Sequence, residues 1–212
     1  IGGEFTIRTS THGIGNENRW RLDVAYDSTN QAFLVVWTEA DIYNESHVYY
    51  DIYGQKIGAD GSILGDPFPI TDLGDNKTQR MPFVAFDDVN NKLLVAYVHN
   101  EDDNYFGDTR YYLDDIYGRF VSIAGDNPVM GPHFPICKEY STQELSDIAF
   151  NGTDKFMVPV SDYASPRLVA VDTGTGATSV VNNLNKLHHG HSLAFDDVNN
   201  CYLRHQMPAN VH

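Results

Sequence analysis

Acidic side chains are concentrated in one segment of the chain, which contains Glu101, Asp102, Asp103 and Asp108. Ca²⁺ takes about six to eight oxygen ligands, and Gly107 allows the sharp turn that a cation-binding loop requires. The segment is therefore a candidate calcium loop, although its spacing differs from the D-x-D-x-D-G pattern of well-defined calcium loops. A solvated acidic loop is the favoured interpretation.

Histidine is concentrated near the end of the chain, where the candidate ligands of a transition metal are His188, His189, His191 and His205. Alternate residues of a strand share a face, so His189 and His191 are expected to point the same way. Zinc or copper needs about three or four such ligands. No known ligand spacing matches, and polar surface histidines are the competing interpretation.

The sequence lacks the short motifs of common enzyme classes. It contains no G-x-S-x-G, P-loop, H-E-x-x-H or dinucleotide-binding motif, and the Ser-x-Asp-x-Gly-x-Thr-Trp box of sialidases does not occur. The paired carboxylates of glycosidases meet in space rather than in sequence, so the many Asp and Glu residues identify no pair. We therefore assign no catalytic residue and favour a non-enzymatic role.

Composition narrows the classes of partner. The chain has 14 basic and 29 acidic residues and a formal net charge of -15. Such a surface repels phosphate backbones and anionic lipids, which argues against nucleic acid as a partner and against membrane binding. No apolar run reaches the roughly 20 residues that a membrane-spanning helix needs. Cys137 and Cys201 form no CxxC motif, so the sequence leaves their redox state open.

The elements that would position these residues come from an internal repeat. Four segments begin at Val24, Val84, Ile148 and Leu193, and each reads as aliphatic-Ala-aromatic-Asp/Asn, a polar turn and an apolar run. This pattern predicts a short strand, a tight turn and a second, buried strand. The Asp and Asn residues of the turns have two interpretations, structural caps of the turn or oxygen ligands of Ca²⁺, and recurrence in every unit favours the first.

A second repeat follows the first in two of the units. Residues 51–71 match residues 115–137, and each segment predicts a third and a fourth strand joined by a turn. The sequence thus predicts an all-β domain of four-stranded antiparallel units like the blades of a β-propeller, with a period of about 60 residues. The expected units are 20–75, 80–140, 145–185 and 190–212 within one domain of 1–212, and residues 1–10 are expected to form a closing outer strand.

The motifs VAYDxxNxxxLVVW, beginning at Val24, and DIYGQxxxxDGxxxG, beginning at Asp51, resemble the blade repeats of secreted or cell-surface β-propeller proteins of bacteria and archaea. The resemblance implies an extracellular or cell-surface location and a binding role, with a protein or a glycan as partner. The third and fourth units lack the DIYGQ motif, so we do not expect four equal blades.

The last unit is incomplete. It ends after its second strand, where Arg204, His205 and Gln206 replace the apolar residues of the earlier units. An edge blade that faces solvent or a partner is the favoured explanation, and a functional pocket is the other. Three arrangements stay open: an imperfectly closed ring, a fragment of a longer propeller, or a strand supplied by a neighbouring subunit through self-association.

Taken together, these patterns predict an extracellular, non-enzymatic binding, adhesion or assembly module, with Ca²⁺ as the candidate stabilising ion. A carbohydrate-binding or glycoside-hydrolysing propeller is the alternative.

Overall fold

The computed structural model of the chain describes residues 4–7, 22–44, 47–71, 77–100, 114–139, 143–161, 166–183, 192–196 and 201–205. These residues form antiparallel strands and turns, which confirms the predicted all-β class. Within this described part of the chain, no helix has the length and apolar character needed to cross a membrane.

The strands form four sheets in chain order, and within the first two sheets each strand pairs with the next. The first sheet contains β1 (Leu22–Asp27), β2 (Ala32–Asn44), β3 (His47–Gly58) and β4 (Ile63–Pro69). The second contains β5 (Thr78–Asp87), β6 (Lys92–Asn100), β7 (Asp114–Ser122) and β8 (Val129–Cys137). These boundaries follow the repeat read from the sequence.

The third sheet contains β10 (Ala149–Phe150), β11 (Lys155–Ser161), β12 (Arg167–Asp172) and β13 (Thr178–Asn183), and β9 (Glu144–Leu145) also pairs with β11. It has a third strand, β12, without carrying the DIYGQ motif. In the described residues the fourth sheet consists of β14 (Ser192–Asp196) and β15 (Cys201–His205) alone. The sheets are therefore unequal, as the sequence predicted.

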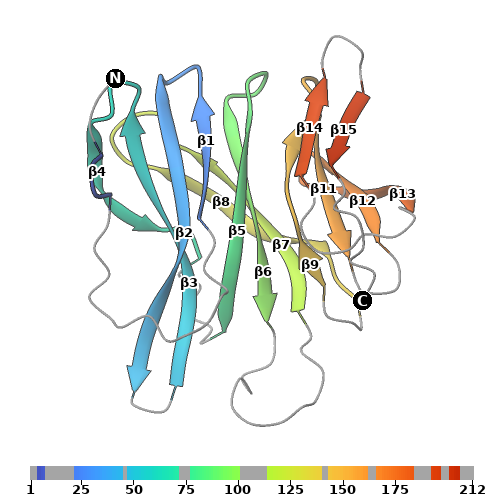
Figure 1. Cartoon of the computed structure of the whole chain (residues 1–212), viewed down its shortest axis with the longest axis horizontal. Helices are drawn as coiled ribbons and strands as arrows, with labels where there is room; N and C mark the ends of the chain where they lie inside the picture. Colours follow the sequence, from blue (N-terminus) through green and yellow to red (C-terminus); the bar gives the residue numbers. More distant parts are fainter. Residues whose placement is uncertain are drawn as a thin grey trace.

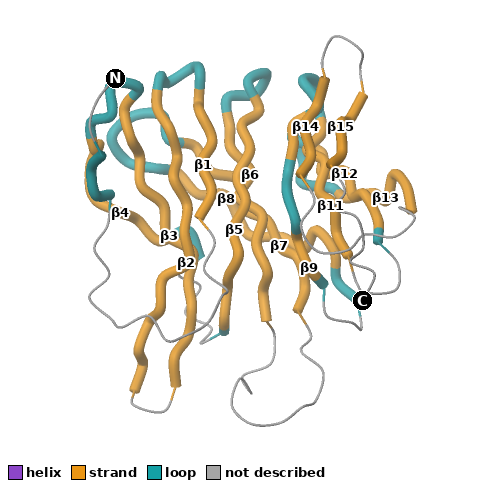
Figure 2. The backbone as a smooth tube through the Cα atoms, viewed as in Figure 1, coloured by secondary structure: helices purple, strands orange, loops and turns teal. Residues whose placement is uncertain are grey.

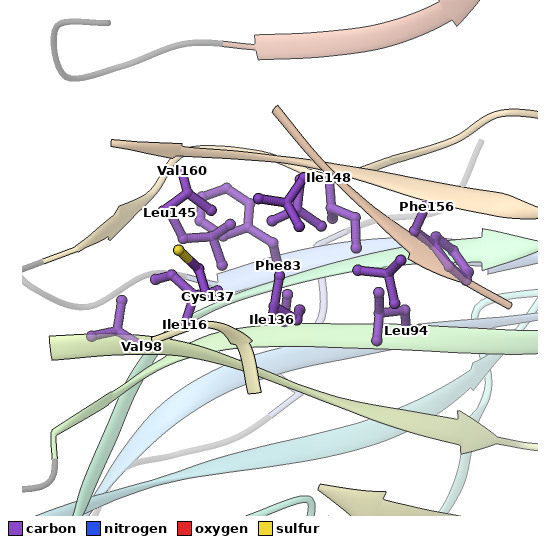
Figure 3. Close-up of a cluster of buried hydrophobic side chains, with 14 residues drawn as sticks. Phe83, Leu94, Val98, Ile116, Ile136, Cys137, Leu145, Ile148, Phe156 and Val160 are labelled. Carbon is purple, nitrogen blue, oxygen red and sulfur yellow. The ribbon is translucent and has the colours of Figure 1, made fainter. Parts of the chain in front are cut away.

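The sheets pack in series, one beside the next, as Figure 1 and Figure 2 show. Alternate residues of a strand point to opposite faces, so a central sheet is covered on both sides. One apolar cluster lies between the first and second sheets and includes Leu34, Val36, Val84, Val95 and Tyr97. The other lies between the second and third sheets, where Figure 3 shows Phe83, Leu94, Ile136, Phe156 and Val160 among its members.

Two repeat-related glycines allow this dense packing inside the sheets. A Cβ added to Gly118 would lie 2.8 Å from Ile136 Cδ1 and 3.1 Å from Leu94 Cδ1, and a Cβ added to Gly54 would lie 3.0 Å from Ile70 Cδ1. The Gly of the DIYG motif is thus required because the neighbouring apolar side chains fill the space above it.

A bulge interrupts the pairing of β5 and β6 between Arg80 and Phe83. Met81 has a φ of 55° and Pro82 has no N–H to donate to a ladder, so this stretch cannot continue a regular strand. The Met81 N–H instead donates to Thr38 Oγ1 of the first sheet at 3.2 Å. The bulge therefore also links two sheets.

Long side chains add further links between the first two sheets. Lys56 Nζ donates to the carbonyl of Ile123 at 2.8 Å, and Arg119 donates from NH1 to the carbonyl of Ile70 at 2.6 Å. Residues 4–7 lie near the β3–β4 turn, since a Cβ added to Gly61 would lie 3.9 Å from Phe5. The closing outer strand expected for residues 1–10 stays a prediction.

Candidate functional site

The residues predicted to bind metals fall largely outside the described part of the chain. Glu101, Asp102, Asp103 and Asp108 belong to the segment between β6 and β7, and this segment lies outside the described residues. His188, His189 and His191 also lie outside them. The backbone of His205 belongs to β15, but its side chain is not among those described. Within the described ranges, no three His, Cys, Asp or Glu side chains are grouped so that they could hold a metal ion.

The predicted calcium segment does have described anchors at both of its ends. Asn100 ends β6 and Asp114 begins β7, and the two residues face each other in the strand register. Asn100 Nδ2 donates to Asp114 Oδ1 at 3.0 Å. The segment from 101 to 113 is thus bracketed by a side-chain hydrogen bond between buried residues.

Arg80 completes this anchor with a two-point contact to the same carboxylate. Its NH1 donates to Asp114 Oδ1 at 3.1 Å and its NH2 donates to Asp114 Oδ2 at 2.5 Å. Arg80 is 7% exposed and Asp114 is 3% exposed. Paired N–H groups match the two carboxylate oxygens in geometry, which makes this a charge-assisted contact of defined direction. Both oxygens of Asp114 are therefore engaged in holding β5, β6 and β7 together.

The other face of the same three strands carries a second polar group of residues. Gln79 Nε2 lies 3.1 Å from His99 Nδ1, and both side chains are buried. When the amide donates, Nδ1 is the acceptor and the proton of a neutral imidazole sits on Nε2. Gln79 Oε1 is buried with no hydrogen-bond partner. This amide is held in place by one bond and by its packing.

Aromatic and imidazole rings continue from this group to the surface. The His99 and Tyr117 ring centroids are 4.8 Å apart, and Tyr117 stacks on His133 at 5.1 Å with an interplanar angle of 17°. His133 is exposed, whereas Tyr117 and His99 are buried. A stacked imidazole that reaches solvent offers both a flat apolar surface and a polar edge to a partner.

This end of the second sheet carries a network of buried polar and aromatic side chains. Arg80, Asn100 and Asp114 fix one face, and Gln79, His99 and Tyr117 fix the other. We call these six residues together with His133 the platform. It positions the ends of the acidic segment, and it presents an exposed ring beside them.

The turns at Asp27, Asp87 and Asn151 are held by their own side chains, and residues 197–200 of the fourth turn lie outside the described part of the chain. Asp27 Oδ1 accepts the N–H groups of Thr29 at 3.0 Å and Asn30 at 2.9 Å, and equivalent pairs of bonds form at Asp87 and Asn151. Asn30 Nδ2 also donates to Asp27 Oδ2 at 2.7 Å. These bonds support the structural interpretation of the turns, since the side-chain oxygens of Asp and Asn cap the turn backbone.

The platform was not identified from the sequence, because the candidate ligands were the acidic residues of segment 101–108 and the histidines near the end of the chain. A signal was present in the polar residues Thr78, Gln79 and Arg80, which directly precede the strand residues that begin at Met81, and in His99 and Asn100, which directly follow the apolar run that ends at Val98. Polar residues at the ends of buried strands need partners, so their recurrence across neighbouring strands indicates a shared network.

Comparisons with known proteins add no assignment, since no protein-family model and no curated protein matches this sequence.

Proposed function

We propose that the chain is an extracellular, non-enzymatic binding, adhesion or assembly module built on a β-propeller. The main support for this proposal is the order in which the sheets contact one another. β1 packs against β5, β5 against β10, and β10 against β14. In a propeller the first strands of successive four-stranded blades lie next to one another around an axis, and this succession follows that rule.

Binding is proposed at the platform and at the segment that it anchors. The buried Arg80–Asp114 contact holds the ends of an acidic segment, and Ca²⁺ bound by Glu101, Asp102, Asp103 and Asp108 would stabilise that segment. A rigid base lowers the entropy that a binding segment loses when a partner is bound. The partner class is a protein or a glycan at the cell surface.

If the module acts in assembly, copies of the chain associate with one another, and we call this the assembly form of the proposed function. Within the described strands, β15 pairs with β14 alone, so one edge of β15 has no described strand beside it. Sheet edges of this kind accept another strand.

A carbohydrate-binding or glycoside-hydrolysing propeller is the second candidate. The exposed His133 ring, which stacks on buried Tyr117, favours it, because flat rings pack well against sugar rings.

One preparation of the purified chain tests both candidates. Light scattering is measured with Ca²⁺ and then with EDTA, and the same sample is assayed for binding to a panel of glycans and for release of reducing sugar. We expect self-association or glycan binding without hydrolysis. Hydrolysis that disappears when one carboxylate is replaced would favour the enzyme. A monomer with no glycan binding and no hydrolysis would contradict the assembly form of the first candidate and the whole of the second.

A further inference from the structure

The first sheet has an apolar face that the described sheets leave open. On β1 the alternate residues Leu22, Val24 and Tyr26 are 71%, 50% and 39% exposed. Alternate residues of a strand share a face, so these three side chains form one surface. Single exposed apolar residues are common on proteins, but a continuous apolar row marks an interaction surface.

The repeat shows what covers this position in the other sheets. Val24 corresponds to Val84 in the second sheet and to Ile148 in the third, and those residues are 5% and 6% exposed. Val84 belongs to the apolar cluster between the first and second sheets, and Ile148 belongs to the cluster between the second and third. In both cases the preceding sheet covers the residue.

The second strand of each unit repeats this difference. Phe33, Val35 and Trp37 of β2 are only half-buried. The corresponding residues of β6 and β11 belong to the inter-sheet clusters and are fully or almost fully buried: Leu93, Val95, Tyr97, Phe156, Val158 and Val160. The correspondence follows from the register, because Tyr26 pairs with Phe33 as Phe150 pairs with Phe156. The first sheet therefore carries the same contact face as the others, and no sheet among the described residues covers it.

We propose that this open face, formed by Leu22, Val24, Tyr26, Phe33, Val35 and Trp37, binds the fourth sheet of a second copy of the chain. The inference rests on the assembly form of the proposed function and names its surface. The residues of this face occupy the same repeat positions as those that pack between sheets inside the molecule. The partner that fits the face is therefore another sheet of the same repeat.

The fourth sheet holds the matching register positions. In the internal contact between the first two sheets, the covering face is formed by Ala32, Leu34 and Val36. On β15 the residues at these register positions are Cys201, Leu203 and His205. The first and the fourth sheet lie on opposite sides of the second sheet in Figure 1, and the contact we propose joins two molecules head to tail. Such a heterologous contact forms open chains or closed rings.

Sedimentation velocity over a concentration series tests the proposal with a matched pair of variants. Val24→Asp places a carboxylate in the open face, and the control Val129→Asp changes a residue of β8 that is 65% exposed. The average sedimentation coefficient of the unmodified chain is expected to rise between about 1 and 200 µM. Val24→Asp is expected to raise the dissociation constant at least about tenfold, because an interface residue near the centre of a contact carries that much free energy. Val129→Asp is expected to behave like the unmodified chain.

Two results would overturn the inference, and they differ in what they say of the proposed function. A chain that is monomeric at every concentration contradicts both this inference and the assembly form of the function. Association that Val24→Asp leaves unchanged contradicts the open face alone and directs the search to other surfaces. Leu22→Asp, at a residue still more exposed than Val24, replaces Val24→Asp if that variant does not fold.

Discussion

The carboxylate of Asp23 accepts the backbone N–H of Val84 at 2.8 Å and so joins the first sheet to the second. Its other oxygen accepts the N–H of Val24 at 2.9 Å. One side chain therefore connects the same repeat position in two successive sheets.

The bond recurs farther along the chain. Asp147 Oδ2 accepts the N–H of Leu193 at 2.6 Å, and its Oδ1 accepts the N–H of Ile148 at 2.8 Å. The aspartate that precedes the aliphatic residue in the first and third units thus links each of those units to the next. Phe83 holds this position in the second unit and packs into the apolar cluster between the second and third sheets.

Asp23→Ala is expected to lower the free energy of unfolding by about 1–3 kcal/mol, because the N–H of buried Val84 loses its acceptor. Asp23→Asn keeps an acceptor oxygen and is expected to cost less. Urea unfolding followed by circular dichroism measures both. Asp66→Ala, at an exposed residue of β4, is the control and should stay within about 0.5 kcal/mol of the unmodified chain. Equal losses in Asp23→Ala and Asp66→Ala would contradict this role of Asp23.

Gly118→Ala is expected to destabilise the fold by about 1–3 kcal/mol, since its Cβ would lie 2.8 Å from Ile136 Cδ1. Gly131→Ala on the adjacent strand is the control, because its Cβ would approach no atom closer than 3.5 Å. Thermal unfolding of the two variants compares them directly. A Gly118→Ala variant as stable as Gly131→Ala would show that the neighbouring side chains move aside without cost.

The sequence predicted the strands, the turns and the unequal units, because each depends on residues close together in the chain. The Asp27 turn is local, and so is the alternation of apolar residues in β2. Contacts between units were harder to predict. Asp23 is 61 positions from Val84, and only the recurrence of an aspartate at position 147 signals a common role.

The candidate site also has one part that the sequence predicted and one part that it did not. The acidic segment was visible in the sequence as a cluster of charges, but its anchor was not. Arg80 reaches Asp114 only because the strand register places β5 and β7 on either side of β6. Nor does a repeat pattern show which of the described sheets has an uncovered face. The open face of the first sheet was found from the exposure of Val24.

Removal of one partner from the buried Arg80–Asp114 pair is expected to be costly. Asp114→Ala leaves the Arg80 guanidinium buried without its counter-ion and should lower the free energy of unfolding by about 3–5 kcal/mol. The double variant Arg80→Met/Asp114→Leu removes both charges and should be more stable than Asp114→Ala. Chemical unfolding of the single and double variants tests this order. A double variant less stable than Asp114→Ala would contradict it.

The third sheet is expected to lose stability at acid pH, when the carboxylate of Asp172 becomes protonated. The hydrogen bonds from Lys155 and Thr175 hold the pKa of Asp172 well below its ordinary value of 3.8. A carboxyl group whose pKa is lowered by folding stabilises the protein above its unfolded pKa, and this contribution is lost as the pH falls through the folded pKa.

Asp172→Asn should therefore lower the melting temperature at about pH 7, and the difference from the unmodified chain should shrink as the pH falls below 3.8. Thermal unfolding at a series of pH values measures it, with Asp126→Asn at an exposed turn as the control. A difference that is constant across the series would mean that the ionised carboxylate is not what stabilises the sheet.

Hydrogen exchange of dilute and concentrated samples tests most directly whether the open face of the first sheet binds another copy. Peptides that cover β1 and those that cover β14 and β15 should exchange more slowly in the concentrated sample, while peptides from the internal strand β6 should not change. Exchange in β1 that is the same at both concentrations would contradict the account.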